Sequence, residues 1–223
     1  MAERDAGAPV VAIDGPSASG KGTVAQEVAR LLRFHYLDSG ALYRLVALAA
    51  ERGGVAPDDE PRLAEVAAGM PVRFEGGETW LDAERATDAI RTVECSRAAS
   101  RVAAMPAVRR ALLERQRAFR KAPGLVAEGR DMGSIVFPDA NLKVFLTATP
   151  ESRAERRYKQ LMDKGIAATL PGLLQDLRER DARDASRSVA PLKQGPDARP
   201  LDTTDMSAAQ AAARIVGWYR GTA

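Results

Sequence analysis

Residues 10–23 read VVAIDGPSASGKGT, and this stretch decides the fold. A short β-branched run from Val10 to Asp14 leads into a loop rich in glycine, proline and serine, and apolar residues then recur at helical spacing. The loop from Gly15 to Lys21 matches the pattern GxxxxGK in the strand, loop and helix context that this pattern requires. The sequence therefore predicts a strand, a phosphate-binding loop and a helix near its start.

A loop of this kind binds phosphate mainly through its backbone. Glycines let successive N–H groups surround the phosphate oxygens, and the N-terminus of the following helix adds partial positive charge. A lysine at the position of Lys21 reaches the β- and γ-phosphates, which a glycine-rich turn without a ligand would not explain. The residues expected to contact ATP are Gly15, Pro16, Ser17, Ala18, Ser19, Gly20, Lys21, Gly22 and Thr23.

One position departs from the commonest form of the loop. Gly22 lies where many such loops carry a serine or threonine that binds Mg²⁺, and Thr23 follows one residue later. The form GKGT resembles the nucleoside monophosphate kinases, in which phosphates and water hold most of the Mg²⁺ coordination. We therefore expect Mg²⁺ to arrive with ATP and predict no metal ligand from the protein, while direct binding by Thr23 stays open.

Strand and helix patterns alternate along the rest of the chain, which predicts an α/β fold of three layers around a parallel, five-stranded sheet. Pro200 cannot donate to a central ladder, so the last strand is expected at a sheet edge. A small β insertion is expected at 71–91, with strands at 72–74 and 79–81 around Gly76 and Gly77. The expected strands are 10–14, 34–37, 125–128, 142–147 and 198–202, and the expected helices are 41–51, 61–69, 93–105, 106–120, 150–164, 171–187 and 207–219.

Composition limits the classes of function. A chain of 223 residues suits one domain with insertions, and its net charge of +3 is too small to indicate nucleic acid as the main partner. No apolar stretch is long enough for a membrane helix and no signal peptide is visible, so we expect a soluble, cytoplasmic protein. Cys95 is the single cysteine and His35 the single histidine, and both are interpreted as structural.

Further motifs give the chain a family resemblance. They include DSGALYR at 38–44, EGRDMG at 128–133 followed by VFPD at 136–139, and an arginine-rich segment from Arg180 to Arg187. Together with GPSASGKGT, these motifs resemble the bacterial-type cytidylate kinase family over nearly the whole chain. The resemblance implies ATP-dependent phosphorylation of CMP and dCMP to their diphosphates by a monomer that binds neither nucleic acid nor membrane.

The resemblance also assigns roles to particular residues. Three arginines, Arg44, Arg130 and Arg187, would clamp the phosphate of the acceptor with Ser39 nearby, because two anionic phosphates approach in line only when their charge is neutralised. The catalytic residues are expected to be Lys21, Arg130 and Arg187. The contacts expected with the base are Ser100, Arg109 and Asp131, and those expected with the sugar hydroxyls are Arg180 and Asp184.

The base contacts make chemical sense for cytosine. Cytosine presents an N4 amino donor beside the N3 and O2 acceptors, so a carboxylate at N4 and a guanidinium near N3 and O2 form a complementary set. Uracil has an acceptor in place of N4, which the carboxylate of Asp131 would repel. The alternative for Arg130 and Asp131 is a solvated ion pair at the end of a strand, and for 180–187 a charged helix face.

The resemblance divides the chain into functional segments. An acceptor-binding segment is expected at about 41–120, and a mobile lid over ATP at about 153–168, with Arg157 as its expected ATP contact. Two other functions remain open from the residues alone. One is a P-loop kinase for another small acceptor, such as a different nucleotide or a metabolite alcohol, and the other is a nucleotide-binding regulatory module. The sequence lacks the NKxD motif of a GTP switch.

Overall fold

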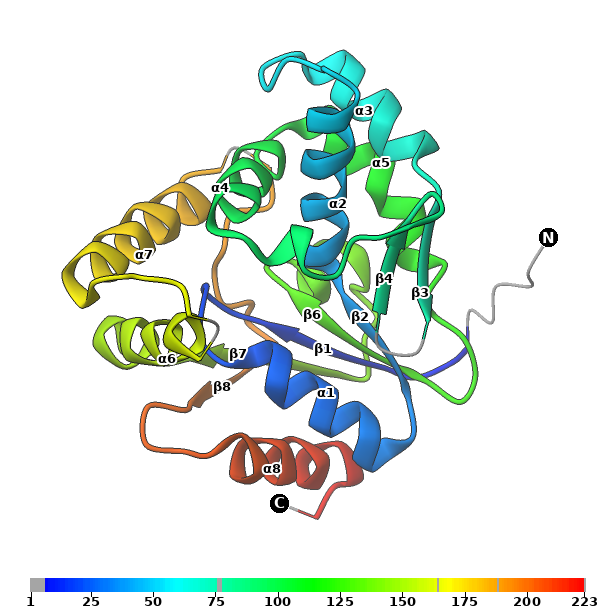
Figure 1. Cartoon of the computed structure of the whole chain (residues 1–223). Coiled ribbons are helices and arrows are strands. Elements are labelled where there is room, and N and C mark those ends of the chain that lie inside the picture. The colour runs from blue at the N-terminus through cyan, green and yellow to red at the C-terminus, as the bar shows by residue number, and fades with distance from the viewer. Residues whose placement is uncertain (1–6, 76–77, 164, 188, 223) are drawn as a thin grey trace. The chain divides into compact units, whose positions relative to one another are not determined.

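The computed structural model describes residues 7–75, 78–163, 165–187 and 189–222, so Gly76, Gly77 and the predicted helix end at Lys164 lie outside the described residues. The chain divides into two compact units (Figure 1). The first unit combines Met1–Leu37 with Ala118–Ala223, and the second unit is Asp38–Arg117. The second unit therefore interrupts the first along the chain.

A five-stranded sheet forms the centre of the first unit, in the order β2-β6-β1-β7-β8. The pairings of β1 with β6, β1 with β7 and β7 with β8 are all parallel, as predicted. β8 lies at the edge, where the missing N–H of Pro200 costs no central ladder bond. The strands are β1 (Val10–Asp14), β2 (His35–Asp38), β6 (Leu125–Gly129), β7 (Leu142–Thr147) and β8 (Arg199–Asp202).

The register of the sheet aligns the ends of its central strands. Asp14, the last residue of β1, lies opposite Gly129 at the end of β6 and opposite Phe145 in β7. The strands are parallel, so the segments that follow β1 and β6 leave the sheet at the same edge, which is where open α/β sheets bind ligands. The fold therefore brings the predicted phosphate loop beside the segment that begins with Arg130.

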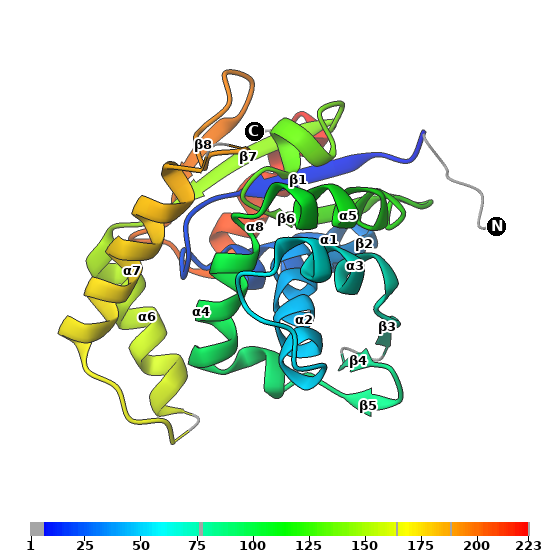
Figure 2. The same cartoon turned by 90° about the horizontal axis from the view of Figure 1, so that it is seen from above.

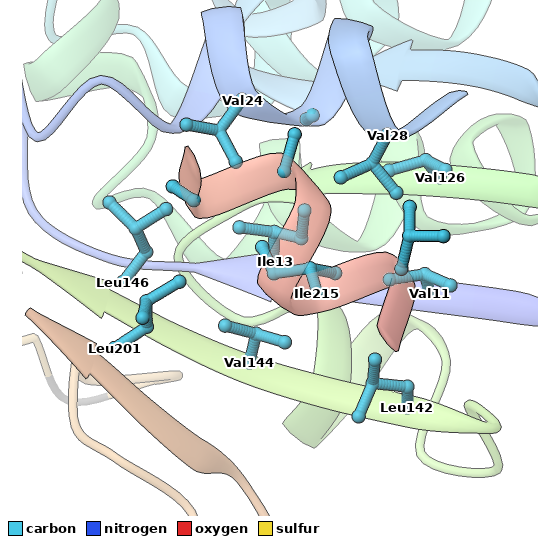
Figure 3. Packing of buried hydrophobic residues seen from close by; sticks show 14 of the residues in the cluster. Val11, Ile13, Val24, Val28, Val126, Leu142, Val144, Leu146, Leu201 and Ile215 are labelled. Carbon is cyan, nitrogen blue, oxygen red and sulfur yellow. The ribbon is translucent and has the colours of Figure 1, made fainter. Parts of the chain in front are cut away.

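Two helices cover one face of this sheet, α1 (Lys21–Leu32) and α8 (Ala208–Arg220) (Figure 3). Val24 and Val28 of α1 and Ile215 of α8 point into a cluster of side chains from the sheet. Their spacing of three or four residues gives each helix one apolar stripe, which the strands cover. The sheet residues of the cluster are Val11, Ile13, Val126, Leu142, Val144, Leu146 and Leu201.

The first unit holds three more helical segments. α6 (Pro150–Met162) and α7 (Leu170–Ala185) lie side by side, as Figures 1 and 2 show. The order Thr149-Pro150 is typical of a helix start, and the Thr149 hydroxyl accepts a hydrogen bond from the N–H of Ser152 while Pro150 occupies the first turn. A single π-type turn, η2 (Met132–Val136), follows β6 and was not predicted from the sequence.

The second unit contains four α-helices among its described residues and a small antiparallel sheet in the order β3-β4-β5 (Figure 2). Asp38 caps α2 by accepting from the N–H of Ala41 at 3.0 Å, and Cys95 is buried, which agrees with its interpretation as a structural residue. The two-residue strand β5 was missed because it is too short to show a pattern. The elements are α2 (Ser39–Arg52), α3 (Glu60–Gly69), β3 (Val72–Glu75), β4 (Glu78–Leu81), β5 (Glu84–Arg85), η1 (Ala89–Arg91), α4 (Val93–Val102) and α5 (Pro106–Arg117).

No helix in the described part of the chain combines the length and apolar character that crossing a membrane requires. Ser207 and Gln210 have the sequence spacing of a capping box, and this box is present at the start of α8. The N–H of Gln210 donates to the Ser207 hydroxyl at 3.2 Å, and the N–H of Ser207 donates to Oε1 of Gln210 at 2.9 Å. Two N–H groups that the helix itself leaves unsatisfied are thereby paired.

We expect Ser207→Ala to lower the free energy of unfolding by about 1 kcal/mol, because it removes the acceptor for the N–H of Gln210. Ser207→Asp is the matched control, since a carboxylate at this position accepts the same bond and should keep stability within about 0.5 kcal/mol of wild type. Urea denaturation followed by circular dichroism measures both. Equal stability of the alanine variant and wild type would show that the box contributes nothing.

Candidate functional site

The loop from Gly15 to Gly20 has a backbone that only particular residues permit. A Cβ atom at Gly15 would lie 2.0 Å from the carbonyl oxygen of Leu146, so the loop passes β7 too closely for any side chain. Ala18 and Gly20 have φ values of 58° and 88°, in the left-handed region. α1 begins immediately afterwards at Lys21, so its first N–H groups face the loop.

Two carbonyl groups of the loop accept hydrogen bonds from residues outside it. Arg153 donates to the carbonyl of Ser17 at 3.1 Å, and Arg156 donates to that of Ser19 at 3.0 Å. The hydroxyl of Thr203 also donates to the carbonyl of Ser19, at 3.3 Å. These bonds use the negative ends of the peptide dipoles, and the N–H groups are left to attract an anion. Sequence reasoning placed Arg153 and Arg156 in the lid and did not foresee this role.

Lys21 lies in a polar, buried position at the start of α1. Its Nζ donates to the carbonyl of Pro16 at 3.2 Å and lies 3.8 Å from Oε2 of Glu128 in β6. The hydroxyl of Tyr36 donates to the other oxygen of Glu128 at 2.9 Å. Glu128 therefore holds the lysine near the loop, a role that its place beside Gly129 and Arg130 did not reveal.

The same carboxylate explains the departure at Gly22. A Cβ atom at that position would lie 2.9 Å from Oε1 of Glu128, which is closer than real Cβ contacts. The usual serine or threonine would therefore displace Glu128 from its place beside Lys21. Glycine at this position keeps the pair of opposite charges together.

The donor atoms near the loop suit a nucleotide that carries its own metal ion. The hydroxyl oxygen of Ser19 is buried and has no hydrogen-bond partner among the described residues. Within that part of the chain, no group of three or more His, Cys, Asp or Glu side chains could hold a metal ion. Mg²⁺ typically takes one or two protein ligands and completes its shell with phosphate oxygens and water, and a buried hydroxyl such as that of Ser19 is chemically suited to such a shell.

Arg130 and Arg187 converge on one buried carboxylate, that of Asp184 in α7. Nε of Arg130 donates to Oδ2 of Asp184 at 2.8 Å, and Nη2 of Arg187 donates to Oδ1. Asp184 is 0% exposed. Burial alone would raise the pKa of this carboxyl group, but the charges of Arg130 and Arg187 outweigh it, so the pKa is lowered. Two of the three predicted phosphate-clamping arginines are therefore held together by a residue predicted to contact the sugar.

Asp131, the predicted base reader, is buried at the start of η2. The two N–H groups that follow it, those of Met132 and Gly133, donate to the two carboxylate oxygens of Asp14, each at 2.8 Å. Burial raises the pKa of Asp14 to about 6, although both hydrogen bonds act in the opposite direction. Asp14 was interpreted from the sequence only as the end of a strand.

The predicted lid arginines differ in their surroundings. Arg153 is 4% exposed and also pairs with Asp181 of α7, with Nη2 and Oδ2 2.6 Å apart. Arg156 donates to the carbonyl groups of Ser19, Thr203 and Thr204. Arg157, the predicted ATP contact, and Arg180, a predicted sugar contact, are partly buried on α6 and α7.

The remaining predicted acceptor residues belong to the second unit. Arg44 donates to Asp38 at 2.6 Å, and Ser39 is buried at the start of α2. The guanidinium of Arg109 lies 5.8 Å from the centre of the Tyr43 ring and donates to the carbonyl of Ala103 at 3.2 Å.

The hydroxyl of Ser100 is buried in α4 without a hydrogen-bond partner in the described part of the chain. Leaving a buried hydroxyl unsatisfied costs about 1–3 kcal/mol, so such an atom is typical of a ligand contact. Ser100 and Ser19, both singled out from the sequence, share this property.

A family model and two known relatives of this chain share one name. A family model described as "Cytidylate kinase" matches residues 11–220. The cytidylate kinase of Chromobacterium violaceum is 60% identical over 211 residues, which cover 95% of each chain. That of Burkholderia pseudomallei (strain 1106a) is 57% identical over 212 residues, which cover 95% of this chain and 93% of its own.

A solved structure also resembles the chain. A gluconokinase from Sinorhizobium meliloti 1021 superimposes with a TM-score of 0.50 at 14% identity, covering 96% of this chain and 92% of its own. At so low an identity the likeness concerns the fold alone. That fold is the P-loop architecture predicted from residues 10–23.

Proposed function

The chain belongs to the cytidylate kinase family, and from this premise we propose that it transfers the γ-phosphoryl group of ATP to CMP and dCMP, giving the diphosphates. The observation that carries the proposal beyond family membership is the register of Asp14 with Gly129. It places the phosphate loop and the Arg130–Asp131 segment at the ends of neighbouring strands. A kinase needs its donor and acceptor sites this close, because the transferred group passes between them in line.

On the donor side, the N–H groups of the loop bind the β- and γ-phosphates of ATP. Lys21 exchanges its contacts with Pro16 and Glu128 for phosphate oxygens and stabilises the charge that develops during transfer. Mg²⁺, when bound with ATP, neutralises charge on the β- and γ-phosphates. The expected ATP contacts stay Gly15, Pro16, Ser17, Ala18, Ser19, Gly20, Lys21, Gly22, Thr23 and Arg157.

On the acceptor side, Arg130 and Arg187 neutralise the phosphate of CMP. Their shared carboxylate, Asp184, holds both guanidinium groups in place before the substrate binds, so little reorganisation accompanies binding. Each carboxylate oxygen has two lone pairs, which lets Asp184 accept from a sugar hydroxyl as well. The further acceptor contacts are proposed to be Ser39, Arg44, Ser100, Arg109, Asp131 and Arg180.

Two broader proposals complete this account. The protein acts as a monomer in the cytoplasm, and Asp38–Arg117 corresponds to the acceptor-binding segment expected at about 41–120. The segment at about 153–168 acts as the lid over ATP. Its helix α6 already contributes Arg153 and Arg156 to the outer side of the phosphate loop, which supports a role next to the donor.

The direct test of this function is an ATP-dependent phosphorylation panel over CMP, dCMP, UMP, AMP, GMP and shikimate. We expect CMP and dCMP to be used far more efficiently than either purine nucleotide, because Arg109 and Asp131 are proposed to read the edge of a pyrimidine. Product formation followed by chromatography gives kcat/KM for each acceptor. AMP or shikimate as the best acceptor would overturn the proposal and favour another P-loop kinase.

Base selectivity is expected to depend on the carboxylate of Asp131. Asp131→Asn keeps the size of the side chain but offers both a donor and an acceptor, so it accommodates the O4 of uracil. Losing one such specific pair is worth about 1–3 kcal/mol, or roughly tenfold to a hundredfold in the ratio of CMP to UMP efficiency. Steady-state kinetics with both nucleotides measures this ratio, which should fall mainly through CMP.

The outcome separates two roles for the same residue. If Asp131 only orients Arg130 as its neighbour in a charged pair, the efficiencies with CMP and UMP should fall together. An unchanged ratio would therefore remove Asp131 from the residues that read the base.

A further inference from the structure

We propose that Asp14 is a positioning residue for acceptor selectivity, because its carboxylate binds the backbone that directly follows Arg130 and Asp131. The proposal rests on the function proposed above, in which these two residues bind the acceptor. Asp14 itself precedes the phosphate loop and belongs to β1. It would act on the acceptor without touching it.

The carboxylate of Asp14 accepts hydrogen bonds from two successive backbone N–H groups. Oδ1 accepts from Met132 and Oδ2 accepts from Gly133, both at 2.8 Å. A carboxylate accepts two parallel N–H bonds, as it does from a guanidinium fork, and such charge-assisted bonds are stronger than neutral ones. An asparagine at this position could satisfy only one of the two, because its amide nitrogen would face the other N–H group.

Asp14 holds a short backbone segment at both of its ends. Before it, Gly129 pairs with Asp14 in the ladder between β1 and β6. After it, Met132 and Gly133 are held by the side chain of the same aspartate. Only Arg130 and Asp131 lie between the two attachments, so Asp14 sets the backbone from which both side chains project. Binding groups must be held within about 0.5 Å of their working geometry, and a residue that fixes their backbone helps to meet this requirement.

The carboxylate of Asp14 lies in a buried position that disfavours its charge. Asp14 is 9% exposed, and burial raises the pKa of its carboxyl group to about 6. The nearby charge of Asp131 raises that pKa further, and the charge of Arg130 lowers it. Burial and the neighbouring carboxylate oppose the charged form of Asp14, and the two N–H bonds offset part of that cost.

The test is the kinetics of Asp14→Asn with CMP and UMP. Misplacing a binding group by about 1 Å costs on the order of a hundredfold in efficiency. We expect the KM for CMP to rise about tenfold or more and the ratio of CMP to UMP efficiency to fall by a similar factor. Binding of a non-hydrolysable ATP analogue should change less than about threefold, because Arg153, Arg156 and Thr203 still hold the loop.

Ile13→Val is the matched control. Ile13 is the neighbouring residue of β1, and its side chain belongs to the core beneath α1 and α8 (Figure 3). This variant should lower thermal stability without changing the KM for CMP or the ratio of CMP to UMP efficiency. A fall in stability of Asp14→Asn with both kinetic quantities unchanged would overturn the proposal. Failure of the proposed function itself would be recognised separately, by a wild-type protein that does not prefer CMP.

A second measurement uses the wild-type protein, so it tests the proposal even if Asp14→Asn does not fold. The amide protons of Met132 and Gly133 should move downfield together as Asp14 ionises, with a common midpoint at a pH of about 6. The charged groups that face Asp14 are Asp131 and Arg130, and the guanidinium of Arg130 has no acceptor atom. Nuclear magnetic resonance spectra between pH 4 and 8 record both signals, and a titration that shifts one signal without the other would overturn the proposal.

Discussion

The parallel pairing of β1 between β6 and β7 is the constraint on which the rest of the site depends. It buries β1 completely and ends all three strands at the same edge, so the segments that follow β1 and β6 emerge as neighbours. It also brings the loop against the carbonyl of Leu146, where only Gly15 fits. The phosphate loop and the Arg130–Asp131 segment are remote in sequence, and this pairing alone makes them parts of one site.

Buried charges in the first unit are arranged in pairs that a substrate can reorganise. Lys21 lies beside Glu128, and Arg130 and Arg187 share Asp184. Removing ions from water is costly, so each cation has an acidic partner in the structure, and in the proposed function phosphate oxygens replace that partner. Such pairs keep the cations in place at little reorganisation cost, and ordered groups of this kind are the main source of transition-state stabilisation in phosphoryl transfer.

Local signals in the sequence sufficed for much of the fold. The loop pattern, the strand lengths, the cap of α2, the capping box of α8 and the edge position forced by Pro200 all depend on a few neighbouring residues. The roles of Asp14, Glu128 and Arg153 depend on contacts with residues more than 100 positions away. No local sequence pattern reveals these roles. A carboxylate at the end of a strand looks the same in the sequence whether it accepts backbone hydrogen bonds or faces solvent.

The central claim is that the phosphate loop acts in catalysis through Lys21, and turnover by Lys21→Ala tests it most directly. The account predicts a fall in kcat with ATP and CMP of at least about a hundredfold, with an unchanged circular dichroism spectrum. Lys121→Ala, which removes an exposed lysine from the loop before β6, should leave kcat unchanged. A folded Lys21→Ala protein with near-normal kcat would contradict the account.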